Sequence, residues 1–232
     1  MLVYGRNVAE EYLKKSEKVR KIYLQEGFRD KNLIFAIEKS KIPVVFKKNF
    51  ELDKLANGIH QGIILDVEDF RYTDYSQFLD QEDAVVVVLD HLEDPHNLGA
   101  IIRTCEAAGV TSIIIPKNRG VEVNATVIKT SVGAIENIPV SMVINLNTTI
   151  QDLKDHGFWV VGTDVENSVD YREIDYSGKI ALVIGNEGEG MSRLVRESCD
   201  FIARIPMRGK VNSLNASVAA GIMIYEIFRQ KG

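Results

Sequence analysis

The feature that most constrains the fold is the apolar run at residues 84–89, where an alanine, four valines and a leucine follow one another. A strand with one solvated face alternates apolar and polar side chains, whereas a strand of a covered parallel sheet is apolar throughout. The run is also too short to span a membrane. We therefore expect a doubly wound α/β domain over residues 83–232. Its further strands are expected at residues 112–115, 140–143, 158–162, 180–184 and 201–205.

A second, smaller α/β unit is expected in residues 1–68, ahead of this domain. Apolar periodicity there alternates between helix and strand. Residues 69–82 lack periodicity and are rich in aspartate, tyrosine, serine and glutamine, so they are expected to form the linker. The expected helices are residues 8–15, 31–40 and 49–56, and the expected strands are residues 19–24, 43–46 and 62–67.

Arg103 lies in an expected helix directly after two apolar residues, Ile101 and Ile102. In a helix its side chain leans back over Gly99 towards Asn97 in the first turn, so we expect the guanidinium to point to a site rather than into solvent. Arginine there can hold a phosphate or orient a hydroxyl with a permanent charge. A structural ion pair with an acid elsewhere in the fold explains this segment equally well, and both interpretations stay open.

A glycine-rich loop follows the expected strand at residues 180–184. Gly185, Gly188 and Gly190 surround Glu187, a pattern typical of unusual backbone torsions or of close approach to a ligand. A dinucleotide-binding loop has the order G-x-G-x-x-G early in its domain, whereas the order here is G-x-x-G-x-G and comes late. A solvated loop acid is the plainer interpretation of Glu187.

Two short polar residues, Ser213 and Asn215, flank Leu214 just before the last expected helix, residues 216–229. Such groups can form a fixed hydrogen-bonding frame around a reacting atom. A helix N-cap, which favours serine and asparagine, would by itself account for one of them.

Together, residues 94–104, 184–191 and 205–217 resemble the three motifs of the SpoU (TrmH-like) family of SPOUT RNA methyltransferases, in the family's order and near its spacing. The resemblance covers residues 82–232. It implies a C-terminal trefoil knot, although pattern reasoning alone predicts an unknotted chain. It also implies S-adenosyl-L-methionine as the cofactor and methyl transfer to a ribose 2′-hydroxyl of RNA.

The resemblance assigns roles to nine residues of this sequence. Arg103 is expected to be the catalytic residue, proposed in the family to accept the proton of the hydroxyl. Because a guanidinium resists deprotonation, we expect it to hold the phosphate and hydroxyl while water takes the proton. The other residues expected around the hydroxyl are Asn97, Glu187, Ser213 and Asn215. The residues expected to hold the cofactor are Thr163, Gly185, Ile205 and Leu214.

Residues 4–7 and 58–63 look like segments of the two-domain members that methylate guanosine in ribosomal RNA. Residues 1–68 accordingly resemble the ribosomal-protein-like RNA-binding domain of those enzymes. A guanosine of 23S rRNA is the expected substrate. Methylation of a transfer RNA ribose and a non-catalytic role in ribosome assembly are the alternatives. The family also implies a homodimer involving the last helix, which carries small residues that allow close packing.

The formal net charge of −5 argues against a generic nucleic-acid coat, which relies on many lysines and arginines to release counterions. Basic residues gather in the first 50 positions, so charge is expected to be segregated by domain. Cys105 and Cys199 lack metal-type spacing and are expected to be core thiols in a reducing compartment. With no signal peptide or apolar span in view, a cytoplasmic protein is expected.

A cluster of potential metal ligands and a lone tryptophan have plainer interpretations. No metal is expected, because Pro95 and its turn scatter the side chains of the cluster. Trp159 sits between apolar neighbours on an expected strand, and we expect it in the core. The potential ligands are Asp90, His91, Glu93, Asp94 and His96.

Overall fold

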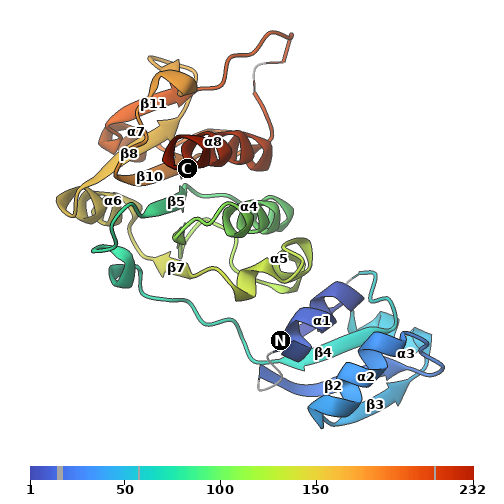
Figure 1. The fold of residues 1–232 in the computed structure, drawn as a ribbon. Helices are drawn as coiled ribbons and strands as arrows, with labels where there is room; N and C mark the ends of the chain where they lie inside the picture. Colours follow the sequence, from blue (N-terminus) through green and yellow to red (C-terminus); the bar gives the residue numbers. More distant parts are fainter. Residues whose placement is uncertain (15–17, 57, 212) are drawn as a thin grey trace. The chain divides into compact units, whose positions relative to one another are not determined.

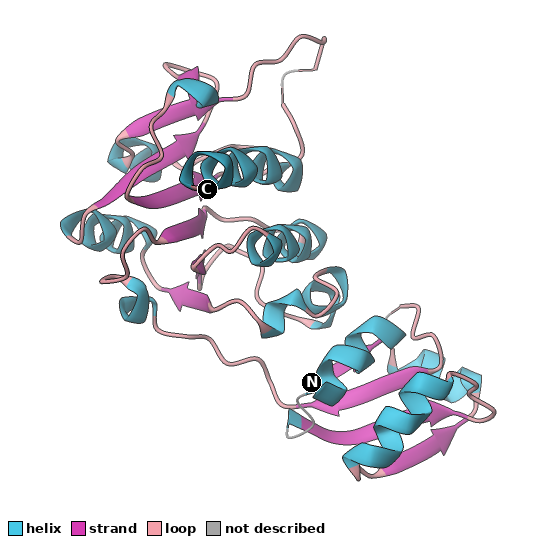
Figure 2. Ribbon diagram, in the orientation of Figure 1, coloured by secondary structure: helices cyan, strands magenta, loops and turns pink. Residues whose placement is uncertain are grey.

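The computed structural model describes residues 1–14, 18–56, 58–211 and 213–232 (Figure 1; Figure 2). By its contacts the chain divides into two compact units. The first comprises Met1–Arg71 and Val123–Glu136, and the second comprises Tyr72–Glu122 and Asn137–Gly232. Each unit has a sheet of its own. Within the described residues, no helix has the length and apolar character needed to cross a membrane.

The first unit is built on a four-stranded sheet with the order β1-β4-β2-β3. β4 is antiparallel to both of its neighbours, whereas β2 and β3 are parallel. Tyr4, Leu52 and Ile64 belong to its core. The elements are β1 (Leu2–Tyr4), α1 (Arg6–Lys14), β2 (Val19–Gln25), α2 (Lys31–Ser40), β3 (Val44–Lys47), α3 (Asn49–Leu55) and β4 (Ile63–Val67), with α5 (Ala125–Thr130) and η3 (Ala134–Glu136).

Val123–Glu136 packs with the first unit although it lies between two strands of the second. The ammonium of Lys129 donates to the carbonyl oxygen of Ile59 at 2.9 Å. Lys18 pairs with the carboxylate of Glu136 at 2.5 Å, and the Glu136 side chain is almost fully buried. Sequence reasoning put this segment with residues 83–232, because a pattern read along the chain follows continuity and carries no information on contacts.

The second unit is built on seven strands with the order β7-β6-β5-β10-β8-β11-β9, all paired in parallel. The expected α/β class with a parallel sheet is confirmed, and the trefoil knot stays a prediction. The strands are β5 (Val85–Leu89), β6 (Ser112–Pro116), β7 (Val140–Val143), β8 (Phe158–Thr163), β9 (Val169–Asp170), β10 (Lys179–Ile184) and β11 (Phe201–Arg204). The helices are η2 (Tyr75–Phe78), α4 (Pro95–Ala107), α6 (Leu146–Asp155), η4 (Tyr171–Glu173), α7 (Arg193–Ser198) and α8 (Ala216–Lys231).

Helices cover both faces of the central strands, which explains the apolar runs in the sequence. α4 and α8 lie together on one face, and α6 and α7 lie on the other (Figure 1). Val86, Val88 and Val183 contribute to the core cluster under α6 and α7. In β5 and β10 every residue after the first is buried.

Trp159 does not lie in the core, so that prediction is wrong. Its neighbours Phe158 and Val160 point into the cluster under α6 and α7. The tryptophan points to the opposite face, where it meets Phe201 with ring centroids 5.7 Å apart and stays 53% exposed. An aromatic residue on a strand is buried only if an element covers its face, and sequence alternation does not reveal which face is covered.

The two cysteines differ in their surroundings. Cys105 on α4 is fully buried, as expected for a core thiol, and burial raises its pKa strongly. Cys199 is only partly buried and forms the C-cap of α7 rather than lying within the helix. Burial is also the main reason that its pKa rises to about 12.

Candidate functional site

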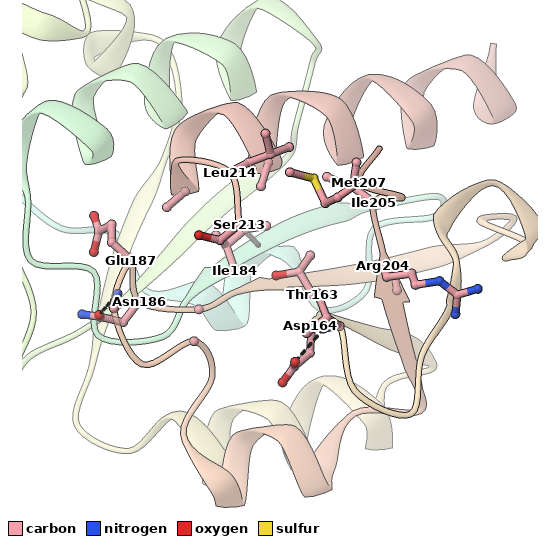
Figure 3. A pocket seen from close by; sticks show the side chains of 17 residues that line it. Thr163, Asp164, Ile184, Asn186, Glu187, Arg204, Ile205, Met207, Ser213 and Leu214 are labelled. Carbon is pink, nitrogen blue, oxygen red and sulfur yellow. Dashed lines mark hydrogen bonds between the residues drawn. The ribbon is translucent and has the colours of Figure 1, made fainter. Parts of the chain in front are cut away.

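A pocket opens where β8, β10 and β11 end and α8 begins (Figure 3). In a parallel sheet the carboxyl ends of neighbouring strands meet at one edge, and ligands bind in the crevice there. Apolar side chains such as Ile184 and Met207 line much of this pocket. The four residues expected to hold the cofactor all line it: Thr163, Gly185, Ile205 and Leu214.

The loop after β10 is folded tightly on itself. Asn186 and Gly190 exchange backbone hydrogen bonds of 2.9 and 3.0 Å. The side-chain oxygen of Asn186 accepts a further hydrogen bond of 2.8 Å from the backbone amide of Gly188. A Cβ added to Gly185 would lie 2.4 Å from the carbonyl carbon of Gly190, so only glycine fits there. Gly188 lines the pocket without such crowding, since its nearest contact would be 3.5 Å away.

The end of β5 holds this loop in place. Asp90, directly after β5, is fully buried. One of its carboxylate oxygens accepts from the backbone amide of Ser192 at 2.6 Å, and the other contacts Nδ1 of His91 at 2.5 Å. The carbonyl oxygen of His91 accepts from the amide group of Asn186 at 2.8 Å. Both ends of the glycine loop are therefore fastened to one strand terminus.

Sequence reasoning missed this positioning role and considered Asp90 and His91 only as metal ligands. The available signal was an acid at the carboxyl end of a buried parallel strand, a place where side chains meet across several strands. Asp94 of the same cluster is the N-cap of α4 and accepts from the amide of His96 at 2.8 Å.

Two of the expected catalytic residues, 90 positions apart in the sequence, contact each other. The side-chain amide of Asn97 donates to the carboxylate of Glu187 at 2.7 Å. Asn97 lies in the first turn of α4 and is 6% exposed, whereas Glu187 is exposed, so a buried amide holds the carboxylate at the edge of the pocket. Glu187 also lines the pocket, which disfavours its interpretation as a purely solvated loop acid.

Ser213 and Asn215 differ in their surroundings. Ser213 lines the pocket beside Leu214 (Figure 3). Asn215 is the N-cap of α8, where its side-chain oxygen accepts from the amide of Ser217 at 2.9 Å and from the hydroxyl of Ser217 at 2.6 Å. The helix cap expected from the sequence is thus Asn215, and Ser213 is the polar group free to face a ligand.

Arg103 is exposed to solvent, so the expectation that its guanidinium is turned away from solvent is wrong. α4 buries the face that carries Leu98, Ile102 and Cys105, and position 103 lies off that face. Within the described residues Arg103 has no hydrogen bond or ion pair, which disfavours a structural ion pair as its role. It does not line the pocket, and its catalytic role stays a prediction.

Three charged residues, Asp164, Glu187 and Arg204, are among those that line the pocket. The guanidinium of Arg204 points away from the other labelled side chains (Figure 3). Asp164 is fixed by Arg196, whose Nε donates to the carboxylate at 2.9 Å. The hydroxyl of Thr163 donates to the carbonyl oxygen of Val183 at 3.1 Å, which fixes the threonine at the wall.

Two family models match the chain and together cover nearly all of it. The SpoU rRNA Methylase family model matches residues 84–225. The model for RNA 2′-O ribose methyltransferase substrate binding matches residues 2–73. A Staphylococcus haemolyticus protein named TrmH family tRNA/rRNA methyltransferase is 45% identical, with 100% of this chain and 96% of the relative covered.

Solved structures of similar fold include the SpoU methyltransferase AviRb from Streptomyces viridochromogenes, with a TM-score of 0.85, 25% identity, and coverage of 100% of this chain and 89% of that one. AviRb has also been solved in complex with AdoMet. An rRNA methyltransferase from Sinorhizobium meliloti is similar with a TM-score of 0.83 and 27% identity, covering 98% of this chain and 86% of that one. The family models, the relatives and the motif geometry agree: this chain belongs to the SpoU (TrmH) family of RNA 2′-O-ribose methyltransferases.

Proposed function

We propose that this protein transfers the methyl group of S-adenosylmethionine to the ribose 2′-hydroxyl of a guanosine in 23S rRNA. The observation that carries the proposal is the meeting of residues from separate motifs at one edge of the parallel sheet. Asn97 is bonded to Glu187, and Glu187 and Ser213 line the same pocket. Solved relatives that contain AdoMet support the choice of cofactor.

The chemistry of the pocket suits S-adenosylmethionine. Its adenine ring is flat and largely apolar, so it can pack against the apolar side chains of Ile205 and Leu214 in the pocket wall. Its sulfonium and amino groups are cationic, and the acidic residues Asp164 and Glu187 are among those that line the pocket. We assign Thr163, Gly185, Ile205 and Leu214 to hold the cofactor, which when bound supplies an electrophilic methyl group.

Arg103 has the properties needed to bind RNA beside the pocket. Its guanidinium is exposed, and it shares α4 with the pocket-edge residue Asn97. A guanidinium forms paired hydrogen bonds to a phosphate and keeps its charge. Because a 2′-hydroxyl is a poor nucleophile, it must be held in line with the methyl group and lose its proton during attack.

We therefore assign distinct tasks to the expected catalytic residues. Arg103 holds the phosphate and the hydroxyl, and water takes the proton. The groups that orient the reacting ribose are Asn97, Glu187, Ser213 and Asn215. The side-chain oxygen of Asn215 is occupied in capping α8, which leaves its amide nitrogen as the group to donate to the ribose.

The distribution of charge supports an RNA-binding role for residues 1–68, with residues 69–82 as linker and residues 83–232 as methyltransferase domain. Positions 1–71 contain 14 lysines and arginines against 11 aspartates and glutamates, whereas the rest of the chain contains 14 against 22. An RNA backbone is attracted to the first part and repelled by most of the second. Because most charged residues of the second part are acidic, RNA is expected to contact that part only at cationic residues such as Arg103.

We further propose a homodimer formed through α8. Val218, Tyr225 and Phe228 lie on this helix and are each about half exposed. The rings of Tyr225 and Phe228 stack edge to face with centroids 6.2 Å apart. Exposed apolar side chains gathered on one helix are typical of a protein interface.

Methyl transfer with radiolabelled S-adenosylmethionine tests the function. The RNA substrates are 23S rRNA and transfer RNA from a strain that lacks this protein. After the reaction, the 2′-O-methyl groups in both RNAs are mapped. Label at one guanosine of 23S rRNA is expected. Transfer RNA is the alternative substrate, because the relatives' name includes both RNAs. If a calorimetric titration shows no binding of S-adenosylmethionine, the alternative of a non-catalytic RNA-binding factor is supported instead.

A further inference from the structure

The first unit contains a second cavity, of about 720 Å³, to which the catalytic proposal assigns no task. It lies where the parallel strands β2 and β3 end and where the turn before β4 meets the start of α1. Arg6 and residues 58–62 line it, so the two sequence segments singled out in this unit, residues 4–7 and 58–63, meet in one wall. The carboxyl ends of parallel strands are a common place for ligands.

A continuous set of hydrogen bonds fixes this wall. Nδ1 of His60 accepts from the backbone amide of Gly62 at 2.9 Å, so the ring proton lies on Nε2, which donates to Asp53 at 3.0 Å. The other oxygen of Asp53 accepts from the side-chain amide of Asn49 at 2.9 Å. The side-chain oxygen of Gln61 accepts from the backbone amide of Arg6 at 2.8 Å. His60, at 6% exposure, is the buried centre of the set.

Three side-chain amides line the cavity, and each has a donor or an acceptor that bonds to no other described residue. Asn49 uses one N–H, and Gln61 uses its oxygen. Gln25 uses neither end of its amide for any bond among the described residues. Asn49 thus offers a carbonyl oxygen, Gln61 offers an NH₂ group, and Gln25 offers both. Amides with a free donor and acceptor pair with the edges of nucleobases.

A cation and an apolar side chain complete the lining. The guanidinium of Arg6 lies 5.3 Å from the centre of the Phe28 ring, and its ion pair with Asp30 is long at 3.4 Å. An arginine plane oriented by an aromatic ring can stack on an unpaired base. Ile59, which is 75% exposed, presents apolar surface at the rim.

We propose that this cavity receives one unpaired nucleotide of the RNA substrate, with the base edge on Gln25, Asn49 and Gln61 and the base plane or phosphate on Arg6. An unpaired nucleotide fits because side chains cannot read the deep, narrow major groove of an RNA duplex. The inference rests on the proposed RNA substrate and adds a specificity subsite to it. The cavity therefore selects the RNA, while the pocket of the second unit carries the cofactor.

The test compares matched variants of the full-length protein. Gln25→Ala and Asn49→Ala remove amides in the cavity, and Asn32→Ala removes an exposed amide on α2 that does not line it. Arg6→Ala has Arg20→Ala as its control, since Arg20 is exposed and outside the cavity. Gln25→Glu keeps the side-chain shape should Gln25→Ala fail to fold. Melting temperatures establish that each variant is folded.

The measurements are the Kd for a fluorescent fragment of 23S rRNA in single-stranded and in duplex form, and the KM and kcat for methyl transfer. Each cavity variant should weaken single-strand binding and raise KM by about fivefold to a hundredfold, the discrimination of a paired base contact. Affinity for S-adenosylmethionine and kcat at saturating RNA should not change, and the control variants should behave as wild type.

Three outcomes overturn the subsite. The first is wild-type RNA affinity and KM in the folded cavity variants, the second is an equal loss in the Asn32 and Arg20 controls, and the third is equal affinity of the wild type for single strand and duplex. Each would leave methyl transfer by the wild type intact. If the wild type instead binds single-stranded RNA through these amides but transfers no methyl group, the subsite stands and the proposed function fails. Equal affinity for single strand and duplex would show that the cavity does not hold an unpaired base.

Discussion

Replacing Gly185 with alanine should damage the cofactor pocket without removing any polar group from it. The new Cβ would lie 2.4 Å from the carbonyl carbon of Gly190 and 2.5 Å from the backbone nitrogen of Met191. Ordinary contact needs at least 3.4 Å, so one side of the loop must move by about 1 Å. The movement strains the two hydrogen bonds between Asn186 and Gly190 and displaces Glu187 from Asn97.

The expected magnitude follows from this geometry. Overpacking of a tight contact destabilises by about 1–3 kcal/mol, and each kcal/mol lowers Tm by about 2–4 °C for a chain of this size. A misplacement of about 1 Å at a reacting site costs on the order of a hundredfold in rate. We therefore expect weaker S-adenosylmethionine binding, a Tm lower by several degrees, and strongly reduced methyl transfer.

Calorimetric titration and thermal melting measure both effects, with Gly188 as the matched position. Gly188→Ala should melt as wild type, because its Cβ would meet only the side-chain oxygen of Asn186 at 3.5 Å. Gly188→Val should also fold but lose cofactor affinity, because its larger side chain extends from a residue that lines the pocket. Wild-type melting and wild-type affinity in Gly185→Ala would refute the reasoning, since the loop would then tolerate the shift.

Arg103→Ala should leave folding and cofactor affinity intact and reduce single-turnover methyl transfer about a hundredfold to a thousandfold. Arg103→Lys should restore little, because it lacks the planar fork, and wild-type transfer by Arg103→Ala would end the catalytic assignment. Asp90→Ala removes the buried carboxylate that accepts from the amide of Ser192 and contacts the ring of His91, so stability should fall by about 1–3 kcal/mol and cofactor affinity should fall with it. Asp80→Ala, at an exposed position, is the control, and equal melting curves for the two variants would contradict the anchoring role. Tyr225→Asp should convert a dimer into a monomer in light scattering, and an unchanged mass would exclude α8 from the interface.

Sequence patterns predicted the strands better than their order. β5 and β10 were recognisable because burial on both faces leaves a continuous apolar run. Their adjacency was not, since periodicity reports how a strand is covered and not which strand lies beside it. The packing of residues 123–136 with the first unit was not predicted either, because periodicity does not report which elements contact each other. The exposure of Arg103 and Trp159 depends on which face of an element is covered, which a single sequence does not record.

The candidate site was predictable where chemistry is local to a motif. The glycine loop and a helix cap at either Ser213 or Asn215 followed from the sequence, and the pocket positions of Ile205 and Leu214 followed from the family resemblance. The buried anchor at Asp90 did not, because its partners, the amide of Ser192 and the ring of His91, become visible only when the strand ends are brought together.

The insertion of β10 between β5 and β8 has a consequence for how the second unit forms during synthesis. The edge of β5 (Val85–Leu89) that pairs with β10 stays unpaired until Lys179–Ile184, about 90 residues later, has been synthesised. Pairings of such long sequence separation fold slowly, and an unpaired apolar strand edge invites aggregation in the meantime. The ends of β8, β10 and β11 that shape the pocket come together only after the middle of the sheet has closed. A ribosome-bound chain that stops before residue 179 should therefore hold a nascent sheet with an apolar edge that recruits chaperones, and it should gain its cofactor pocket among the last events of folding.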